Sequence, residues 1–275
     1  MKDKSRLITY PALCVFLVFL LFPLYWMLCT SFKTNLVIYK VPPEWYPHLP
    51  TLANYARLFR EGAFIGYYLN NFIASFLATA LTVILAVLSG YSLSRFKFRG
   101  SNLLMLLLLS TQMFPLIGIV IALYTVFRSM SLLNTMTGLV LALSAAALPF
   151  CVWLIKGFFD SVPISLEEAA AIDGCGRLGT LARVVLPLSK PGLLAIGTYA
   201  FLLSWDDFLY CLTLITKDNL RTLSVGIALR YLGELSYDWA TVMTISVIGT
   251  LPMLLLFVFF QGYMVQGLTG GSIKG

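Results

Sequence analysis

Acidic side chains stand in a strongly apolar part of the chain. Asp206 and Asp207 follow Trp205 inside a long run of hydrophobic residues. A charge at the centre of a membrane helix costs about 2.5–3.5 kcal/mol on insertion scales, so such residues ordinarily face a protein interior or water. The pair therefore indicates either a polar path through an apolar segment or, with Trp205 and Tyr210, an anchor at a membrane surface.

A second group of charges occupies the stretch from Pro163 to Pro191, which we call the polar island. Between Pro163 and Pro187 its charged residues are Glu167, Glu168, Asp173, Arg177 and Arg183. Carboxylates here could pair with cations of a partner, and the small residues Ala169, Ala170 and Ala171 would let a partner approach the backbone. The alternative is an amphipathic hairpin on a membrane surface whose charges are only solvated.

The polar island has the composition of two short helices joined by glycines. Ser165 is expected to cap the first helix, with Glu168 completing a capping box. Gly174 and Gly176 are expected to supply the positive φ angles that end it. The second helix should then bury one apolar stripe and end at Leu186-Pro187; its stripe is Leu178, Leu181, Ala182 and Val185.

Several kinds of chemistry lack the residues they need. No G-x-x-x-x-G-K-[ST] segment occurs, so the chain has no P-loop of its own. The single histidine, His48, has no plausible catalytic or metal-binding partner, and the five cysteines form no CxxC pair. We therefore predict no enzyme activity, no metal site and no catalytic residues.

The composition of the chain indicates the class of protein to which these charged residues belong. The 275 residues are 59% hydrophobic and only 11% charged, whereas a soluble domain carries about a quarter charged residues. This is typical of a polytopic membrane protein. The net charge of +7 is then better explained by basic residues beside membrane spans and lipid headgroups than by nucleic-acid binding.

Six apolar segments are long enough to cross a bilayer, which takes about 20 residues for about 30 Å of hydrocarbon. Gln112 and Pro115 interrupt the third segment, where Gln112 could bond across helices or line a path. The segments run from about 11 to 31, 68 to 93, 102 to 126, 137 to 155, 191 to 215 and 240 to 262. We predict a single all-α domain over residues 1–275 with six transmembrane helices.

Basic residues set the expected orientation. With both termini and the polar island on one side, that side holds eleven Lys and Arg residues against eight on the other. The bias is clearest in the short turn from Arg95 to Arg99, where the positive-inside rule applies best. We therefore place both termini, this turn and the polar island in the cytoplasm.

The polar island resembles a known motif. Glu168-Ala169-Ala170, then Asp173-Gly174, then Leu186-Pro187, is similar to the EAA motif of ABC importer permeases. The resemblance implies that residues of about 163–187 form coupling helices between spans four and five and dock on a separate ATPase. The implied coupling residues are Glu167, Glu168, Ala169, Ala170, Asp173, Gly174, Leu186 and Pro187.

Other stretches resemble one branch of that family, the binding-protein-dependent carbohydrate permeases of the maltose-permease type. These are Gly90 to Gly100, Phe158 to Pro163, Trp205 to Phe208 and the ending Gly267 to Gly275. Three positions depart from the branch pattern: Ser165 replaces an acid, Cys175 an alanine and Asp206 an asparagine. The last departure concerns the path residues directly.

The resemblance implies a permease subunit of an ATP-driven importer of sugar or oligosaccharide in a bacterial cytoplasmic membrane. Its implied partners are an ABC ATPase dimer that binds ATP and magnesium, a second related permease subunit, an extracytoplasmic solute-binding protein and membrane lipid. Gln112, Trp205, Asp206 and Asp207 would line the path, where carboxylates can bond sugar hydroxyls and the indole can stack on a sugar ring.

Alternatives remain open at this point. The solute could be another small polar compound such as a glycerol phosphate. A secondary transporter would explain intramembrane aspartates but not a Glu-Ala-Ala hairpin, and a membrane scaffold would explain the hairpin but not the Asp pair.

Overall fold

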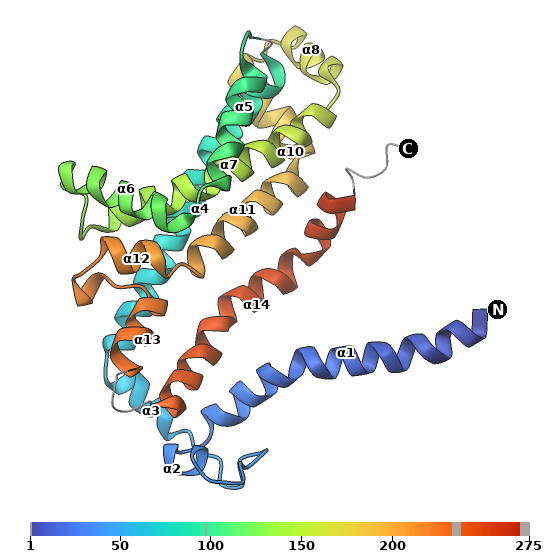
Figure 1. Ribbon diagram of the computed structural model, residues 1–275. Helices are drawn as coiled ribbons and strands as arrows, with labels where there is room; N and C mark the ends of the chain where they lie inside the picture. Colours follow the sequence, from blue (N-terminus) through green and yellow to red (C-terminus); the bar gives the residue numbers. More distant parts are fainter. Residues whose placement is uncertain (1, 97, 233–237, 270–275) are drawn as a thin grey trace. The chain divides into compact units, whose positions relative to one another are not determined.

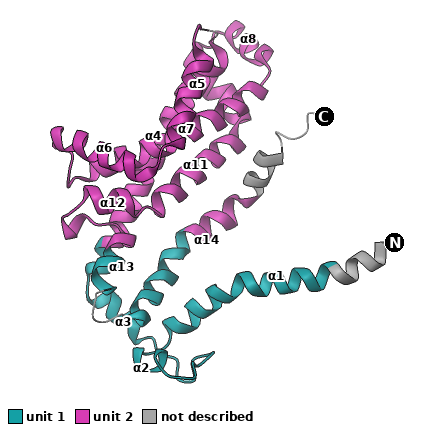
Figure 2. Ribbon diagram, viewed as in Figure 1, with its two compact units in different colours: residues 1–66, 226–252 teal, residues 67–225, 253–275 magenta. Residues whose placement is uncertain are grey.

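The computed structural model describes residues 2–96, 98–232 and 238–269. Within these ranges the chain is helical and contains no β-strand (Figure 1), which confirms the all-α prediction. Lys97 of the predicted basic turn and the last six residues of the tail lie outside the described residues. The chain divides into two compact units (Figure 2): residues 1–66 with 226–252, and residues 67–225 with 253–275.

The first unit contains α1 (Lys2–Ser31), α2 (Asn35–Ile38), α3 (Ala53–Arg60) and the first part of α14 (Trp239–Thr269). Asn54 on α3 donates to the carbonyl oxygens of Ser31 and Lys33 at 2.9 and 2.8 Å. Because the last carbonyls of a helix have no partner within it, this buried side chain holds the end of α1 against α3.

A polar network closes the start of α14 in the same unit. The Asp238 carboxylate accepts hydrogen bonds from Asn35 Nδ2 at 2.8 Å and from the Thr241 backbone at 3.1 Å. It also pairs with Arg57 at 2.6 Å. The aspartate thus caps α14 and ties it to α2 and α3.

The second unit is built around α7 (Met136–Ser161), which packs along α11 (Lys190–Trp205). Two glycines allow the close approach of neighbouring helices. A Cβ at Gly90 of α4 (Ala63–Arg95) would lie 2.6 Å from Ile155 Cγ2, and one at Gly192 of α11 would lie 2.5 Å from the Phe158 ring. The same unit also contains α5 (Ser101–Ser110), α6 (Leu116–Ser129), α12 (Leu209–Leu214), the helices of the polar island and the start of α13 (Leu223–Tyr231), which continues into the first unit.

Four described helices are long and apolar enough to cross a membrane, and they match the first, second, fourth and sixth predicted segments. The third segment is two helices bent by 104° between Met113 and Leu116, as its Pro115 suggests, since proline interrupts helical hydrogen bonding. The count rises to six if each bent pair forms one span.

The fifth segment is not the continuous helix that its apolar run from 191 to 215 suggests. Helix α11 ends at Trp205, and a separate short helix, α12, covers Leu209–Leu214. At the N-terminal end of α11, residues 177–188 meet residues 190–205 at an angle of 85°. The break after Trp205 falls at the two aspartates and places them between helices.

Candidate functional site

The polar island folds into α8 (Ile164–Ile172), α9 (Arg177–Thr180), a π-helical turn η2 (Leu181–Val185) and α10 (Leu186–Leu188). The predicted capping box is wrong. Pro163 occupies the N-cap position with φ of −59° and ψ of 131°, without a side-chain hydrogen bond, and Ser165 already lies inside α8. Proline suits this boundary because it favours the start of a helix over its interior.

A positive φ angle was predicted at both Gly174 and Gly176, and it is confirmed at Gly174 alone. Gly174 has φ of +83°, and the Cys175 N–H donates to the Ala170 carbonyl at 2.9 Å, which closes the end of α8. Gly176 instead has φ of −71° and sits at the N-cap of α9. The expectation of a positive φ at Gly176 is therefore wrong.

The second helix of the polar island buries a narrower stripe than predicted. Leu181 and Val185 are buried, but Leu178 is 73% exposed and Ala182 is also exposed. The wider π turn at Leu181–Val185 shifts the helical register, so 3.6-residue spacing fails there. The turn directly precedes Leu186-Pro187, and the chain bends sharply just beyond it.

The predicted coupling residues fall into an exposed and an inward group. Glu168, Ala169, Asp173, Gly174 and Pro187 are exposed, Leu186 is half-buried, and Ala170 is buried. Glu167 faces inward, with its carboxylate paired to Arg95 Nε at 2.5 Å and accepting a hydrogen bond from the Tyr91 hydroxyl at 2.8 Å.

Sequence reasoning missed the most exposed large apolar side chain of the polar island. Ile172, at the last position of α8, is 87% exposed. Its signal was present in the sequence, since an isoleucine stands between Ala171 and Asp173 on an otherwise small and acidic surface. With its neighbours Ala169 and Gly174 it forms an apolar face bordered by acids.

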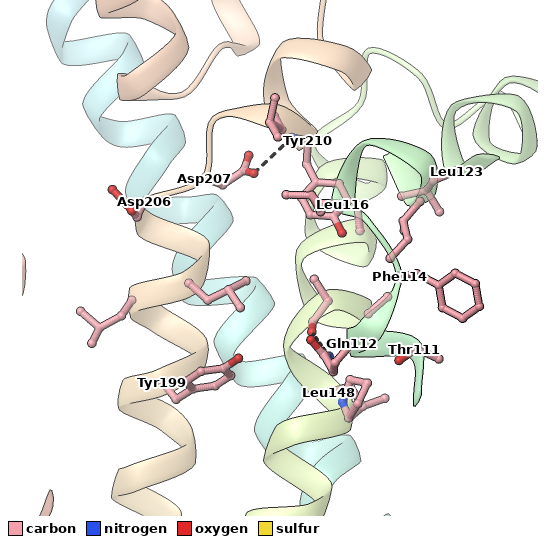
Figure 3. A pocket seen from close by; sticks show the side chains of 18 of the residues that line it. Thr111, Gln112, Phe114, Leu116, Leu123, Leu148, Tyr199, Asp206, Asp207 and Tyr210 are labelled. Atoms are coloured by element: carbon pink, nitrogen blue, oxygen red, sulfur yellow. Dashed lines mark hydrogen bonds between the residues drawn. The ribbon is translucent and has the colours of Figure 1, made fainter. Parts of the chain in front are cut away.

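The second candidate site is a cavity of about 980 Å³ in the second unit (Figure 3). It is bounded by α5, α6, α7, α11 and α12 and by Met253 of α14. Most of its lining is aliphatic or aromatic, and its polar groups are Thr111, Gln112, Tyr199, Asp206, Asp207 and Tyr210. Three of the four predicted path residues therefore line one cavity.

The two aspartates have different surroundings at this cavity. Asp207 accepts hydrogen bonds from the backbone N–H groups of Tyr210 at 3.1 Å and Cys211 at 3.0 Å, so it caps α12 (Figure 3). Asp206 is exposed at the C-terminal end of α11, where the helix dipole disfavours a carboxylate. Asp206 is therefore the carboxylate that is open to a solute.

The other two predicted path residues differ in access. Gln112 is exposed at the break between α5 and α6 and donates to the Ala146 carbonyl of α7 at 3.0 Å. Trp205 is only 4% exposed and packs between Phe201 and Tyr68, with ring centroids 5.5 and 5.7 Å away. In this conformation its indole is part of the core and not a surface on which a sugar could stack.

Residues 79–270 match the family model described as "Binding-protein-dependent transport system inner membrane component". The chain belongs to this family. It is an inner-membrane, multi-pass component of an ABC importer, a transport protein that works with an ATPase and a substrate-binding protein.

Curated relatives extend the likeness over nearly the whole chain. The sulfoquinovosyl glycerol transport system permease protein SmoH of Agrobacterium fabrum is 40% identical over 272 residues, covering 99% of this chain and 95% of the relative. The trehalose/maltose transport system permease protein MalG of Thermococcus litoralis is 35% identical over 257 residues, covering 93% and 92%. The predicted resemblance to carbohydrate permeases is confirmed.

A solved structure shares the fold. A chain of a bacterial ABC transporter involved in the import of the acidic polysaccharide alginate matches with a TM-score of 0.83 over 94% of this chain and 96% of that one. The two sequences are 21% identical, so this likeness concerns the fold alone.

Proposed function

We propose that this chain is the permease subunit of an importer for a sugar or oligosaccharide and that its polar island docks on the ATPase. The observation that carries the docking is the exposed end of α8, where Ile172 stands 87% exposed beside Ala169 and Gly174. An apolar side chain among small residues suits a protein interface, whose centre is ordinarily apolar with a polar rim. Glu168 and Asp173 supply that rim.

The energy for transport would come from the partner. Two ATPase subunits would bind ATP and magnesium, and their closure would move the polar islands of this chain and of a second, related permease subunit. An extracytoplasmic solute-binding protein would deliver solute through connections such as residues 32–66 and 217–238. No catalytic residue of this chain is needed for that cycle.

The proposed topology has six spans, with the third and fifth broken and with both termini in the cytoplasm. A broken helix is tolerated within a membrane where its backbone lines a cavity or packs inside protein. The breaks at Met113–Leu116 and Asp206–Phe208 both border the 980 Å³ cavity. This favours a path role for the cavity over surface anchoring for Asp206.

The charges of the cavity favour an uncharged solute. Asp206 and Asp207 are its ionisable acids, and none of its described lining residues is Lys, Arg or His. Carboxylates accept hydrogen bonds from sugar hydroxyls but repel a phosphate group, because like charges in a partly desolvated site interact strongly. A glycerol phosphate is therefore the weaker of the two solute classes.

Reconstitution tests this function. The chain would be placed in liposomes with its ATPase, second permease and binding protein, and uptake of radiolabelled maltose, trehalose and glycerol phosphate would be measured. We expect ATP-dependent uptake of a neutral sugar. Uptake driven by an ion gradient without ATP would indicate a secondary transporter, and preferred uptake of glycerol phosphate would overturn the sugar assignment.

A further inference from the structure

The segment Gly90 to Phe96 resembles carbohydrate permeases in sequence, yet the function proposed above gives it no task. Its Arg95 ends α4 and has a side chain that is only 10% exposed. Arg95 Nε donates to Glu167 Oε1 at 2.5 Å, and Nη2 donates to the carbonyls of Phe159 at 2.8 Å and Val162 at 3.0 Å. One guanidinium therefore joins the ends of α4 and α7 to the first turn of α8.

Helix electrostatics explain why an arginine and a glutamate suit these positions. The C-terminal carbonyls of α7 carry partial negative charge, which a guanidinium complements. Glu167 lies in the first turn of α8, where the helix dipole favours an acid. Arginine fits better than lysine because its planar fork presents several donors at fixed angles.

Neighbouring side chains reinforce the same junction. The Tyr91 hydroxyl donates to Glu167 Oε2 at 2.8 Å, and the Ser94 hydroxyl donates to Asp160 of α7 at 2.5 Å. The Arg177 guanidinium of α9 lies 4.8 Å from the centre of the Phe96 ring, within cation–π range. Contacts from the last turns of α4, and from Phe96 directly after it, thus reach α7, α8 and α9.

The junction should resist separation. Both partners of the ion pair are about nine-tenths buried, with side chains 10% and 11% exposed. Removing one partner of such a pair leaves an uncompensated charge away from water, which is strongly unfavourable. Sliding α8 along α4 would break the ion pair and the Tyr91 hydrogen bond to Glu167. Separating the ends of α4 and α7 would break both carbonyl contacts of Arg95.

We infer that Arg95 is a positioning residue that clamps α8 to the ends of α4 and α7, so that displacement of the docking surface moves these helices with it. The inference rests on the proposed docking of α8 on an ATPase. Glu167 then pairs with Arg95 inside the permease. The contacts with the ATPase are made by Glu168, Ala169, Ile172 and Asp173.

The test measures how many ATP molecules the reconstituted importer hydrolyses for each solute imported. In Arg95→Gln, hydrolysis should continue while import falls, so this ratio should rise at least about twofold, the lower end of what residues in such networks contribute to coupling. Arg95→Lys should restore the ratio in part, because it keeps the charge but not the fork. Arg99→Gln removes the same charge four residues away and should leave the ratio unchanged.

A second variant covers the case in which Arg95→Gln fails to assemble. Tyr91→Phe removes one hydrogen bond to Glu167 without changing charge, and it should raise the ratio above that of the unmodified importer and of Arg99→Gln. If Arg95 acts through Glu167, the double variant Arg95→Gln/Glu167→Gln should be no less coupled than the more affected single variant.

The outcomes separate the clamp from the function on which it rests. An unmodified importer that retains no ATPase would overturn the proposed function. An unmodified importer that works, with an unchanged ratio in every assembled Arg95 and Tyr91 variant, would overturn the clamp. Additive effects of Arg95→Gln and Glu167→Gln would also overturn it.

Discussion

At the scale of single residues, two side chains of the same type have different roles. Asp206 and Asp207 are adjacent, yet the carboxylate of Asp207 caps α12 through Tyr210 and Cys211, whereas that of Asp206 is exposed. The cost of a charge in an apolar segment predicted that the pair is special. This cost could not show which of the two aspartates caps a helix, because that depends on where α11 ends.

Substituting the two aspartates should separate these roles. Asp207→Ala should lower the free energy of unfolding by about 1 kcal/mol through loss of a helix cap, whereas Asp206→Ala should have a much smaller effect on stability. Uptake should fall in Asp206→Asn at unchanged stability. Thermal unfolding in detergent and solute uptake measure the two effects, and normal uptake in both Asp206→Asn and Asp207→Asn would remove the cavity from the path.

Asp238 gives a residue-scale prediction for pH. Burial tends to raise the pKa of its carboxyl group, but hydrogen bonds from Asn35 and Thr241 and the charge of Arg57 outweigh burial and hold the pKa below its usual value. A depressed folded-state pKa contributes stability above the unfolded-state value of about 3.9, and that contribution is lost as pH falls through the folded-state value.

The measurement is the difference in unfolding temperature between the unmodified protein and Asp238→Asn across pH. The difference should stay constant from neutral pH down to about 4, where an unperturbed aspartate titrates, and should shrink below that. A difference that is equally large at pH 3 would contradict the ionised role of Asp238.

At the scale of elements, most helices follow from apolar runs and their interruptions. Pro115 marks the break between α5 and α6, and Gly174 marks the end of α8. The start of α8 directly after Pro163, the π turn at Leu181–Val185 and the end of α11 were not predicted. These depend on packing and on contacts between distant segments, which local spacing does not contain.

The turn after α8 yields a prediction with a control in the same hairpin. Gly174→Ala forces a side chain into the left-handed region at φ of +83°, which costs about 1–2 kcal/mol. Gly179→Ala meets only an ordinary contact, 3.8 Å from Cys175 Cβ, so it should be neutral or slightly stabilising. Chemical denaturation should show the difference; equal stabilities would mean that the turn is not held in this conformation.

At the scale of the whole molecule, composition predicted an all-helical membrane protein, and the resemblance of the polar island to the EAA motif implied a permease. The family match confirms the permease. The two compact units were not predicted, because each combines segments from distant parts of the chain. The sequence also did not show which of the predicted path residues share a cavity. Gln112 and Asp206 are 94 positions apart in sequence, and only the fold of the second unit brings them to one lining.

The central claim is that the polar island holds the ATPase, and retention of that ATPase during purification tests it most directly. Ile172→Glu places a charge on the proposed docking surface, and Leu36→Glu makes the same change at a side chain of α2 that is similarly exposed, 85% against 87%. We predict that the unmodified chain and Leu36→Glu retain a P-loop ATPase, while Ile172→Glu retains about tenfold less or none, as expected for the loss of an interface hot spot. Equal retention by Ile172→Glu, or no ATPase with the unmodified chain, would contradict the claim.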